Sequence, residues 1–127
     1  MDIRQDRVYT RDHEWVRLEG NTAYIGITDH AQEALGAIVF AELPPEGEKM
    51  EAGDSLAVLE SVKAASAVYT PVAGTVVLVN RALDDKPERL NEDPYGNHIA
   101  GIAPVDAAML AGLMDAEAYE AFVASGG

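Results

Sequence analysis

Residues Ser55 to Asn80 read SLAVLESVKAASAVYTPVAGTVVLVN, and this stretch carries the clearest information about the fold. Ser55–Leu59 and Ala67–Tyr69 have the composition of β-strands, and the segment ESVKAAS between them predicts a hairpin with Lys63 at its tip. A turn containing proline and glycine then leads into Thr75–Asn80, the strongest strand signal in the chain. The pattern predicts antiparallel strands around an exposed lysine.

Strand and turn signals continue on both sides of this stretch. The other expected strands are His13–Leu18, Thr22–Ile27, Ala37–Leu43 and Ile99–Ile102. The expected helices are residues 28–35, with Thr28 as a cap and Gly36 as a stop, and then Asp106–Leu113 and Asp115–Val123. The acidic, proline-containing segment Leu83–Tyr95 predicts a loop. Short strands and turns over 127 residues predict one domain, residues 1–127, that is mainly β and built as a sandwich or flattened barrel.

The composition excludes several functional classes. The net charge is −13, from 22 acidic and 9 basic residues, so nucleic acids and anionic membranes would be repelled. No cysteine is present, which excludes disulfides, thiolate metal sites and cysteine nucleophiles. Three histidines without zinc-type spacing do not predict a metal site. The first residues resemble no signal or transit peptide, and no segment is long enough to span a membrane, so we expect a cytoplasmic protein.

Lys63 lies beside small residues, Ala64–Ser66, so a partner enzyme can approach its amine closely. Lysine amines are mostly protonated at neutral pH, so acylation needs an activated acyl group and an enzyme that removes the proton. Glu60 offers such an enzyme a recognition contact. An acylated lysine on a rigid hairpin becomes a flexible arm with a fixed pivot, which raises the effective concentration of its far end in neighbouring active sites. Taken alone, however, an exposed lysine on a turn is most often only a solvated charge.

The segment Glu60–Ser66, followed by Thr70–Gly74, resembles the lipoylation motif of the glycine cleavage H protein family. Biotin carriers favour methionines beside the lysine, and acyltransferase lipoyl domains an acidic residue before it, whereas Val62 and Ala64 flank it here. Other blocks resemble the family in the same order, from about Tyr9 to Phe122: His13–Val16, Gly26–Gln32, Glu92–Gly96 and Asp115–Tyr119.

The resemblance implies a lipoyl/biotinyl-type β-sandwich with lipoate attached covalently to Lys63. The neighbouring residues implied in recognition during lipoylation are Glu60, Ser61, Val62 and Ala64. The implied activity is that of a carrier and not an enzyme. It would shuttle the aminomethyl group of glycine between glycine decarboxylase (pyridoxal phosphate), aminomethyltransferase (tetrahydrofolate) and dihydrolipoyl dehydrogenase (FAD). A lipoate ligase or lipoyl synthase would supply the arm, and a carrier that visits several partners is expected to be a monomer.

The resemblance also implies that the loaded arm folds into a surface cleft. The family pattern places Glu14 in that cleft, with Asp12 and His30 nearby. The aminomethyl group is cationic, so carboxylates or neutral acceptors suit it. Many members carry an acidic residue where this chain has Ala67, and our hypothesis is that Asp12 compensates for its absence.

A second departure follows Gly96. The family continues with a Gly-Trp pair, whereas Asn97–Ile102 is one residue shorter and has no tryptophan. We therefore expect a looser final strand and a different docking surface. Two alternatives remain at this point. One is an H-like lipoyl carrier that serves sulfur oxidation or relays lipoyl groups, and the other is an enzyme or metal-binding module whose activity would survive Lys63→Arg.

Overall fold

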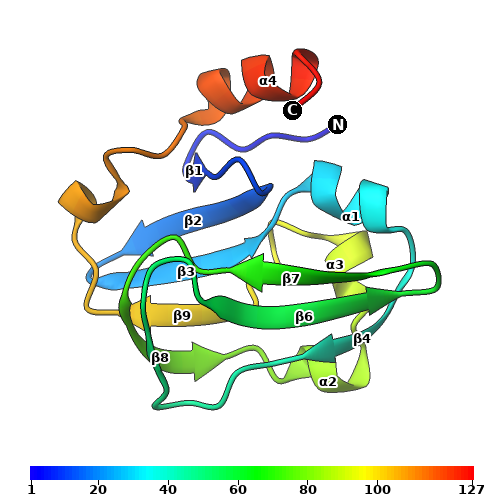
Figure 1. Cartoon of the computed structure of the whole chain (residues 1–127), viewed down its shortest axis with the longest axis horizontal. Helices are drawn as coiled ribbons and strands as arrows, with labels where there is room; N and C mark the ends of the chain where they lie inside the picture. Colours follow the sequence, from blue (N-terminus) through cyan, green and yellow to red (C-terminus); the bar gives the residue numbers. More distant parts are fainter.

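The computed structural model describes residues 1–127 and consists of two antiparallel β-sheets surrounded by short helices (Figure 1). The strands are β1 Val8–Tyr9, β2 Glu14–Glu19, β3 Thr22–Ile27, β4 Ile38–Glu42, β5 Lys49–Met50, β6 Ser55–Ser61, β7 Ala65–Tyr69, β8 Gly74–Val79 and β9 Ala100–Ala103. The larger sheet has the order β1-β2-β3-β9-β8-β5, and the smaller one the order β4-β6-β7. The expected sandwich is confirmed, but both sheets keep open edges and do not close into a flattened barrel.

The larger sheet contains the hairpin that the sequence predicts between residues 13 and 27. β2 and β3 pair from Glu14 opposite Ile27 to Glu19 opposite Thr22. Gly20 turns the chain with a φ of 61°, a conformation that glycine adopts without steric cost.

The sequence predicts a loose final strand, and this prediction is wrong for β9. It pairs with β3 on one side and β8 on the other, in the interior of the larger sheet. Ala100 and Ile102 are fully buried, and a Cβ on Gly101 would lie 2.9 Å from Cγ of Leu78. Glycine is therefore required here by close packing, which the comparison of motifs alone did not reveal.

The smaller sheet carries the lysine hairpin, and its edge strand β4 is bulged. Ile38 lies opposite Ser61 and Phe40 opposite Glu60, so one extra residue is inserted between the two pairs. The burial pattern shifts accordingly: Ile38 is buried, Val39 and Phe40 are both exposed, and the next residue is buried again.

The core fills the space between the sheets. A cluster of 19 buried residues includes Ile25 and Ile102 from the larger sheet and Leu59 and Val68 from the smaller one. Each such side chain contributes about 1.5–3 kcal/mol when it is removed from water, so this cluster supplies most of the force that holds the sheets together.

The first helix follows the sequence prediction closely. α1 spans Asp29–Leu35, with the hydroxyl of Thr28 accepting a hydrogen bond from the N–H of Ala31 and with Gly36 at its end. Its N-cap satisfies a free N–H of the first turn. In Figure 1 this helix lies beside the β6–β7 hairpin.

The region Leu83–Tyr95 is not the simple loop that its polarity predicts. It holds two four-residue helices, α2 Ala82–Asp85 and α3 Arg89–Glu92, which bury Leu83 and Leu90 respectively. Helices of this length have no sequence periodicity to detect, and tertiary packing of one leucine each stabilises them.

The C-terminal region contains one α-helix where two were expected. Residues Asp106–Leu113 form only a 3-10 helix, Ala107–Leu110, with Asp106 as its cap. α4 spans Ala116–Ala124, and the carboxylate of Asp115 accepts the N–H of Ala118 at 2.8 Å. No helix of the structure has the length and apolar character needed to cross a membrane.

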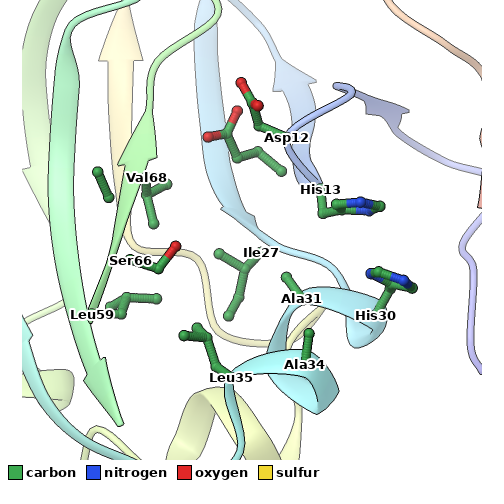
Figure 2. A pocket seen from close by; sticks show the side chains of 12 residues that line it. Asp12, His13, Ile27, His30, Ala31, Ala34, Leu35, Leu59, Ser66 and Val68 are labelled. Carbon is green, nitrogen blue, oxygen red and sulfur yellow. The ribbon is translucent and has the colours of Figure 1, made fainter. Parts of the chain in front are cut away.

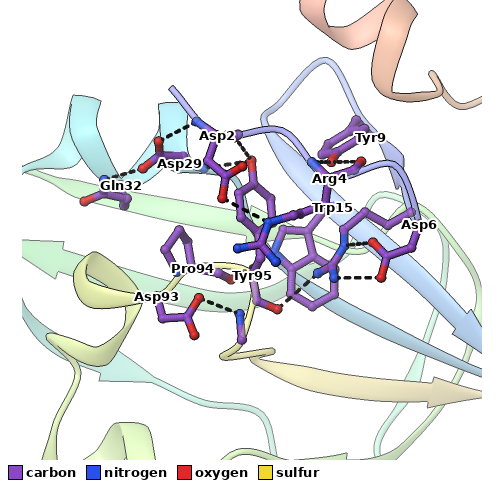
Figure 3. Close-up of polar contacts among 12 residues, drawn as sticks. Asp2, Arg4, Asp6, Tyr9, Trp15, Asp29, Gln32, Asp93, Pro94 and Tyr95 are labelled. Atoms are coloured by element: carbon purple, nitrogen blue, oxygen red, sulfur yellow. Dashed lines mark hydrogen bonds and ion pairs between the residues drawn. The ribbon is translucent and has the colours of Figure 1, made fainter.

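The N-terminal segment is held by a cation–π stack and hydrogen bonds (Figure 3). The guanidinium of Arg7 lies over the ring of Trp15 at 4.5 Å, and the Trp15 indole N–H donates to the carbonyl of Pro94 at 3.0 Å. The hydroxyl of Tyr95 donates to the carbonyl of Asp2, whose N–H donates to the Asp29 carboxylate at 2.9 Å. These contacts fix the N-terminus against the start of α1.

Candidate functional site

The hairpin tip presents Lys63 to solvent on an ordered turn. Hydrogen bonds from the Ser61 N–H to the Ala64 carbonyl, at 2.7 Å, and between the paired strands close the turn. The Ser61 hydroxyl accepts the N–H groups of Lys63 and Ala64 at 3.3 and 3.1 Å. Ser61, which the motif marks as a recognition residue, therefore also shapes the turn, while Glu60, Val62, Lys63 and Ala64 are exposed.

The tip rests against the junction between α1 and β4. The Val62 N–H donates to the carbonyl of Ala37 at 3.2 Å. A Cβ placed on Gly36 would lie 3.5 Å from Cε of Lys63 and 3.9 Å from its Nζ. The lysine thus starts beside the C-terminal end of α1.

Asn91 on α3 braces this junction, although no sequence motif marks it. Its amide group accepts the N–H of Ile38 at 2.9 Å and donates to the carbonyl of Gly36 at 2.8 Å and to the side chain of Gln32 at 3.0 Å. Asn91 therefore ties α1 to β4 directly below the lysine turn. Its position inside a segment expected to be a loop gave no signal of this role.

A cleft of about 210 Å³ lies between α1, the start of β2 and the edge strand β7 (Figure 2). Its twelve lining residues combine an apolar wall with polar groups at one end: Asp12, His13, Glu14, Ile27, His30, Ala31, Ala34, Leu35, Leu59, Ser66, Ala67 and Val68. Ala34 and Leu35 lie just before Gly36, and Ser66 follows the hairpin tip, so the cleft opens close to Lys63.

Glu14 is the buried carboxylate of this cleft. One of its oxygens accepts the Thr10 hydroxyl at 2.9 Å, and the other accepts the N–H of Tyr69 at 2.7 Å. Burial raises the pKa of Glu14 to about 6, although both hydrogen bonds act in the opposite direction. At neutral pH the cleft therefore holds an ionised carboxylate that a neighbouring cation would stabilise.

Asp12 and His30, the other two residues expected here, also line the cleft. Asp12 is exposed, and its carboxylate makes no hydrogen bond or ion pair within the chain. The His30 ring stacks on that of His13 with centroids 4.1 Å apart, and its buried Nδ1 has no hydrogen-bond partner. In Figure 2, Asp12 and His13 come from the same segment before β2, and His30 on α1 lies beside His13.

A hydroxyl chain connects the histidine pair to the C-terminal helix. The Tyr119 hydroxyl lies 2.8 Å from Nδ1 of His13 and 2.8 Å from the hydroxyl of Thr28, the cap of α1. Burial, together with the neighbouring His30, lowers the pKa of His13. His13 therefore favours the neutral form, and α4 helps to position this wall of the cleft.

The family model described as glycine cleavage H-protein matches residues 7–126. The chain belongs to this family. Membership confirms the expectation of a lipoyl carrier of the glycine cleavage system with covalently bound lipoate. The relatives compared give no support to the alternative of an H-like carrier for another pathway.

Close relatives agree over nearly the full length. The glycine cleavage system H protein of Thermoanaerobacter sp. (strain X514) is 52% identical over 97% of this chain and 98% of its own length. One from Thermus thermophilus is 52% identical over 94% of both chains. The crystal structure of a glycine cleavage system H protein from Mycobacterium marinum superposes with a TM-score of 0.83 at 34% identity, covering 98% of each chain.

Proposed function

We propose that Lys63 is the residue that carries lipoate. The observation that carries this proposal is the combination of an exposed amine on a serine-ordered turn with a cleft that opens beside it. The cleft fits the group: its apolar side, Ile27, Leu35 and Leu59, suits an aliphatic arm, and its polar end holds a carboxylate. Lys49 and Lys86 are also exposed, but neither lies at a hairpin tip beside a cleft.

Attachment requires only an accessible amine from this chain. Nζ attacks the acyl carbon of a lipoyl adenylate on the attaching enzyme, the amide bond forms as AMP leaves, and the excess protons of the amine pass to that enzyme and solvent. Glu60, Ser61, Val62 and Ala64 form the surface around the amine, with Ser61 holding the turn in one conformation. When bound, lipoate supplies a disulfide that is reduced as it takes up the aminomethyl group and is later reoxidised.

The residues of the cleft would hold and shield the loaded end of the arm. Glu14 offers a buried carboxylate with further acceptor capacity, which a cationic amine would occupy with a charge-assisted hydrogen bond. Asp12 provides a second, unpaired carboxylate at the same end, and His30 forms part of the wall there. Ala67 lines the cleft without contributing a polar group, which leaves this task to Asp12 and Glu14.

The chain acts as a carrier and performs no reaction of its own. Its partners would be glycine decarboxylase, aminomethyltransferase and dihydrolipoyl dehydrogenase, with lipoate ligase or lipoyl synthase supplying the arm in the cytoplasm. The exposed turn gives these enzymes access to the arm, and the net charge of −13 favours basic docking surfaces.

Intact-mass spectrometry after incubation with lipoate ligase, ATP and lipoate tests the attachment site. The wild type and the matched control variants Lys49→Arg and Lys86→Arg should gain one lipoyl mass, whereas Lys63→Arg should gain none. Modification that persists in Lys63→Arg, or that peptide mapping places on another lysine, would overturn the assignment.

The rate at which the loaded aminomethyl group is lost in water tests the cleft. Glu14→Ala should lose it faster than the wild type, and Asp12→Ala should show a smaller increase. If Asp12→Ala loses the group no faster than the wild type while Glu14→Ala does, Asp12 does not compensate for the missing acidic residue at position 67.

A further inference from the structure

Two large apolar side chains are exposed on β4 because of its bulge. Val39 is 56% exposed and Phe40 51%, although regular alternation along a strand would turn one of them inward. The extra residue between the Ile38 and Phe40 pairings re-aims both side chains to the outside. Two large apolar side chains that stay in water do not contribute the free energy that burial would give, so this arrangement is unfavourable for the isolated chain.

This exposed pair lies directly beside the lysine turn. Phe40 is opposite Glu60, and Glu60 is opposite Ala65, so these three residues form one row across the smaller sheet. Two residues beyond Glu60 towards the tip, the N–H of Val62 donates to the carbonyl of Ala37, which precedes β4. Val62 itself is 75% exposed. We call Val39, Phe40 and Val62 the bulge patch.

Unpaired carboxylates border the bulge patch. Glu60 lies across from Phe40 and Glu42 follows on the same strand, and both are exposed. The ion pairs of the chain involve other acids, namely Asp2, Asp6, Glu19 and Asp84. An apolar centre with acidic edges is complementary to an apolar hollow with arginine or lysine at its rim.

We infer that the bulge patch docks the enzyme that attaches lipoate to Lys63, through an apolar hollow with a basic rim beside its lysine channel. This inference rests on the proposed attachment at Lys63. The attaching enzyme must bring Nζ itself into its active site, so its footprint has to cover the residues around the turn. The enzymes of glycine cleavage act on the far end of the arm and not on Nζ, so their active sites do not have to reach the base of the arm.

The test measures kcat/KM for lipoate attachment to the unmodified protein, followed by intact mass. Phe40→Ser should lower kcat/KM at least tenfold, because central aromatic anchors dominate interface affinity. Val39→Ser should lower it severalfold. The matched control is Val77→Ser, which changes an exposed valine (46% exposed) on β8 in the other sheet and should leave the rate unchanged.

Salt and charge provide a second readout. Attachment to the wild type should slow as ionic strength rises, and Glu60→Gln should weaken that dependence. All variants are compared with the wild type by thermal unfolding, and the conclusions use only variants with unchanged melting temperatures; Phe40→Thr replaces Phe40→Ser if the latter is unstable.

The outcomes separate this inference from the proposed function. A wild type without any lipoyl mass on Lys63 refutes the proposed function itself. If lipoate is attached to the wild type and to Phe40→Ser at the same rate, the docking role is refuted and the proposed function stands. If attachment is also normal but lipoylated Phe40→Ser transfers the aminomethyl group more slowly, the patch belongs to an enzyme of glycine cleavage and the inference is overturned. A wild-type dimer that Phe40→Ser abolishes would likewise overturn the inference and assign the patch to a second copy of the chain.

Discussion

Replacing Glu14 with glutamine removes a carboxylate whose ionisation the fold opposes, while the shape of the side chain is preserved. Glu14 is only 3% exposed and is held by Thr10 and by the backbone of Tyr69. Burial raises its pKa to about 6 from the ordinary 4.5, against the effect of those two hydrogen bonds. A shift of roughly 1.5 units corresponds to about 2 kcal/mol, at about 1.4 kcal/mol per unit.

The sign of the pH dependence follows from this shift. Because the pKa is higher in the folded than in the unfolded chain, the folded chain binds more protons between pH 4.5 and about 6. Glu14 therefore lowers the free energy of unfolding as the pH rises through this window. The difference in that free energy between wild type and Glu14→Gln should fall by about 2 kcal/mol between a pH well below 4.5 and a pH well above 6.

Urea denaturation at a series of pH values measures this difference. The other carboxylates contribute nearly equally to both proteins, so subtraction isolates Glu14. A difference that stays constant within about 0.5 kcal/mol across the range would refute the raised pKa. In the loaded protein, a cationic group beside Glu14 should lower that pKa, which carbon NMR of the carboxyl group can follow; an unchanged value on loading would refute contact between the two.

Three further predictions concern the packing that supports the cleft. Gly26→Ala should destabilise the chain by about 1–3 kcal/mol, because the new Cβ would lie 2.5 Å from the ring of buried Trp15. Calorimetry should show a fall in melting temperature, and Gly112→Ala, whose Cβ meets nothing within 4 Å, is the unaffected control. Asn91→Ala should lower the free energy of unfolding, measured by urea denaturation, by about 2–4 kcal/mol and should slow lipoate attachment, because the N–H of Ile38 and the carbonyl of Gly36 lose their partner. A variant as stable as the wild type would contradict the bracing role. Tyr119→Phe should lower the free energy of unfolding by about 1–3 kcal/mol, because Nδ1 of His13 and the hydroxyl of Thr28 lose their shared partner. An unchanged midpoint in urea denaturation would argue against the hydroxyl chain.

Local sequence preferences were sufficient for most of the secondary structure. The hairpin β2–β3, the capped helix α1 and the strands on either side of Lys63 were all predicted close to their observed bounds. Turn residues and caps act over a few positions, so they can be read without tertiary information. The two four-residue helices α2 and α3 were missed because each depends on one leucine buried in the core of the folded chain.

Contiguous motifs in the sequence were enough to identify the family and to place Lys63 at a hairpin tip. The surroundings of that lysine depend on the folded chain. The cleft joins residues near position 13, position 30 and position 67, and the raised pKa of Glu14 arises from that assembly. The outward Phe40 depends on a register shift between two strands, and the brace from Asn91 on a contact across 55 residues of sequence. Long-range pairing and burial set these features, because their energies exist only when distant segments have come together.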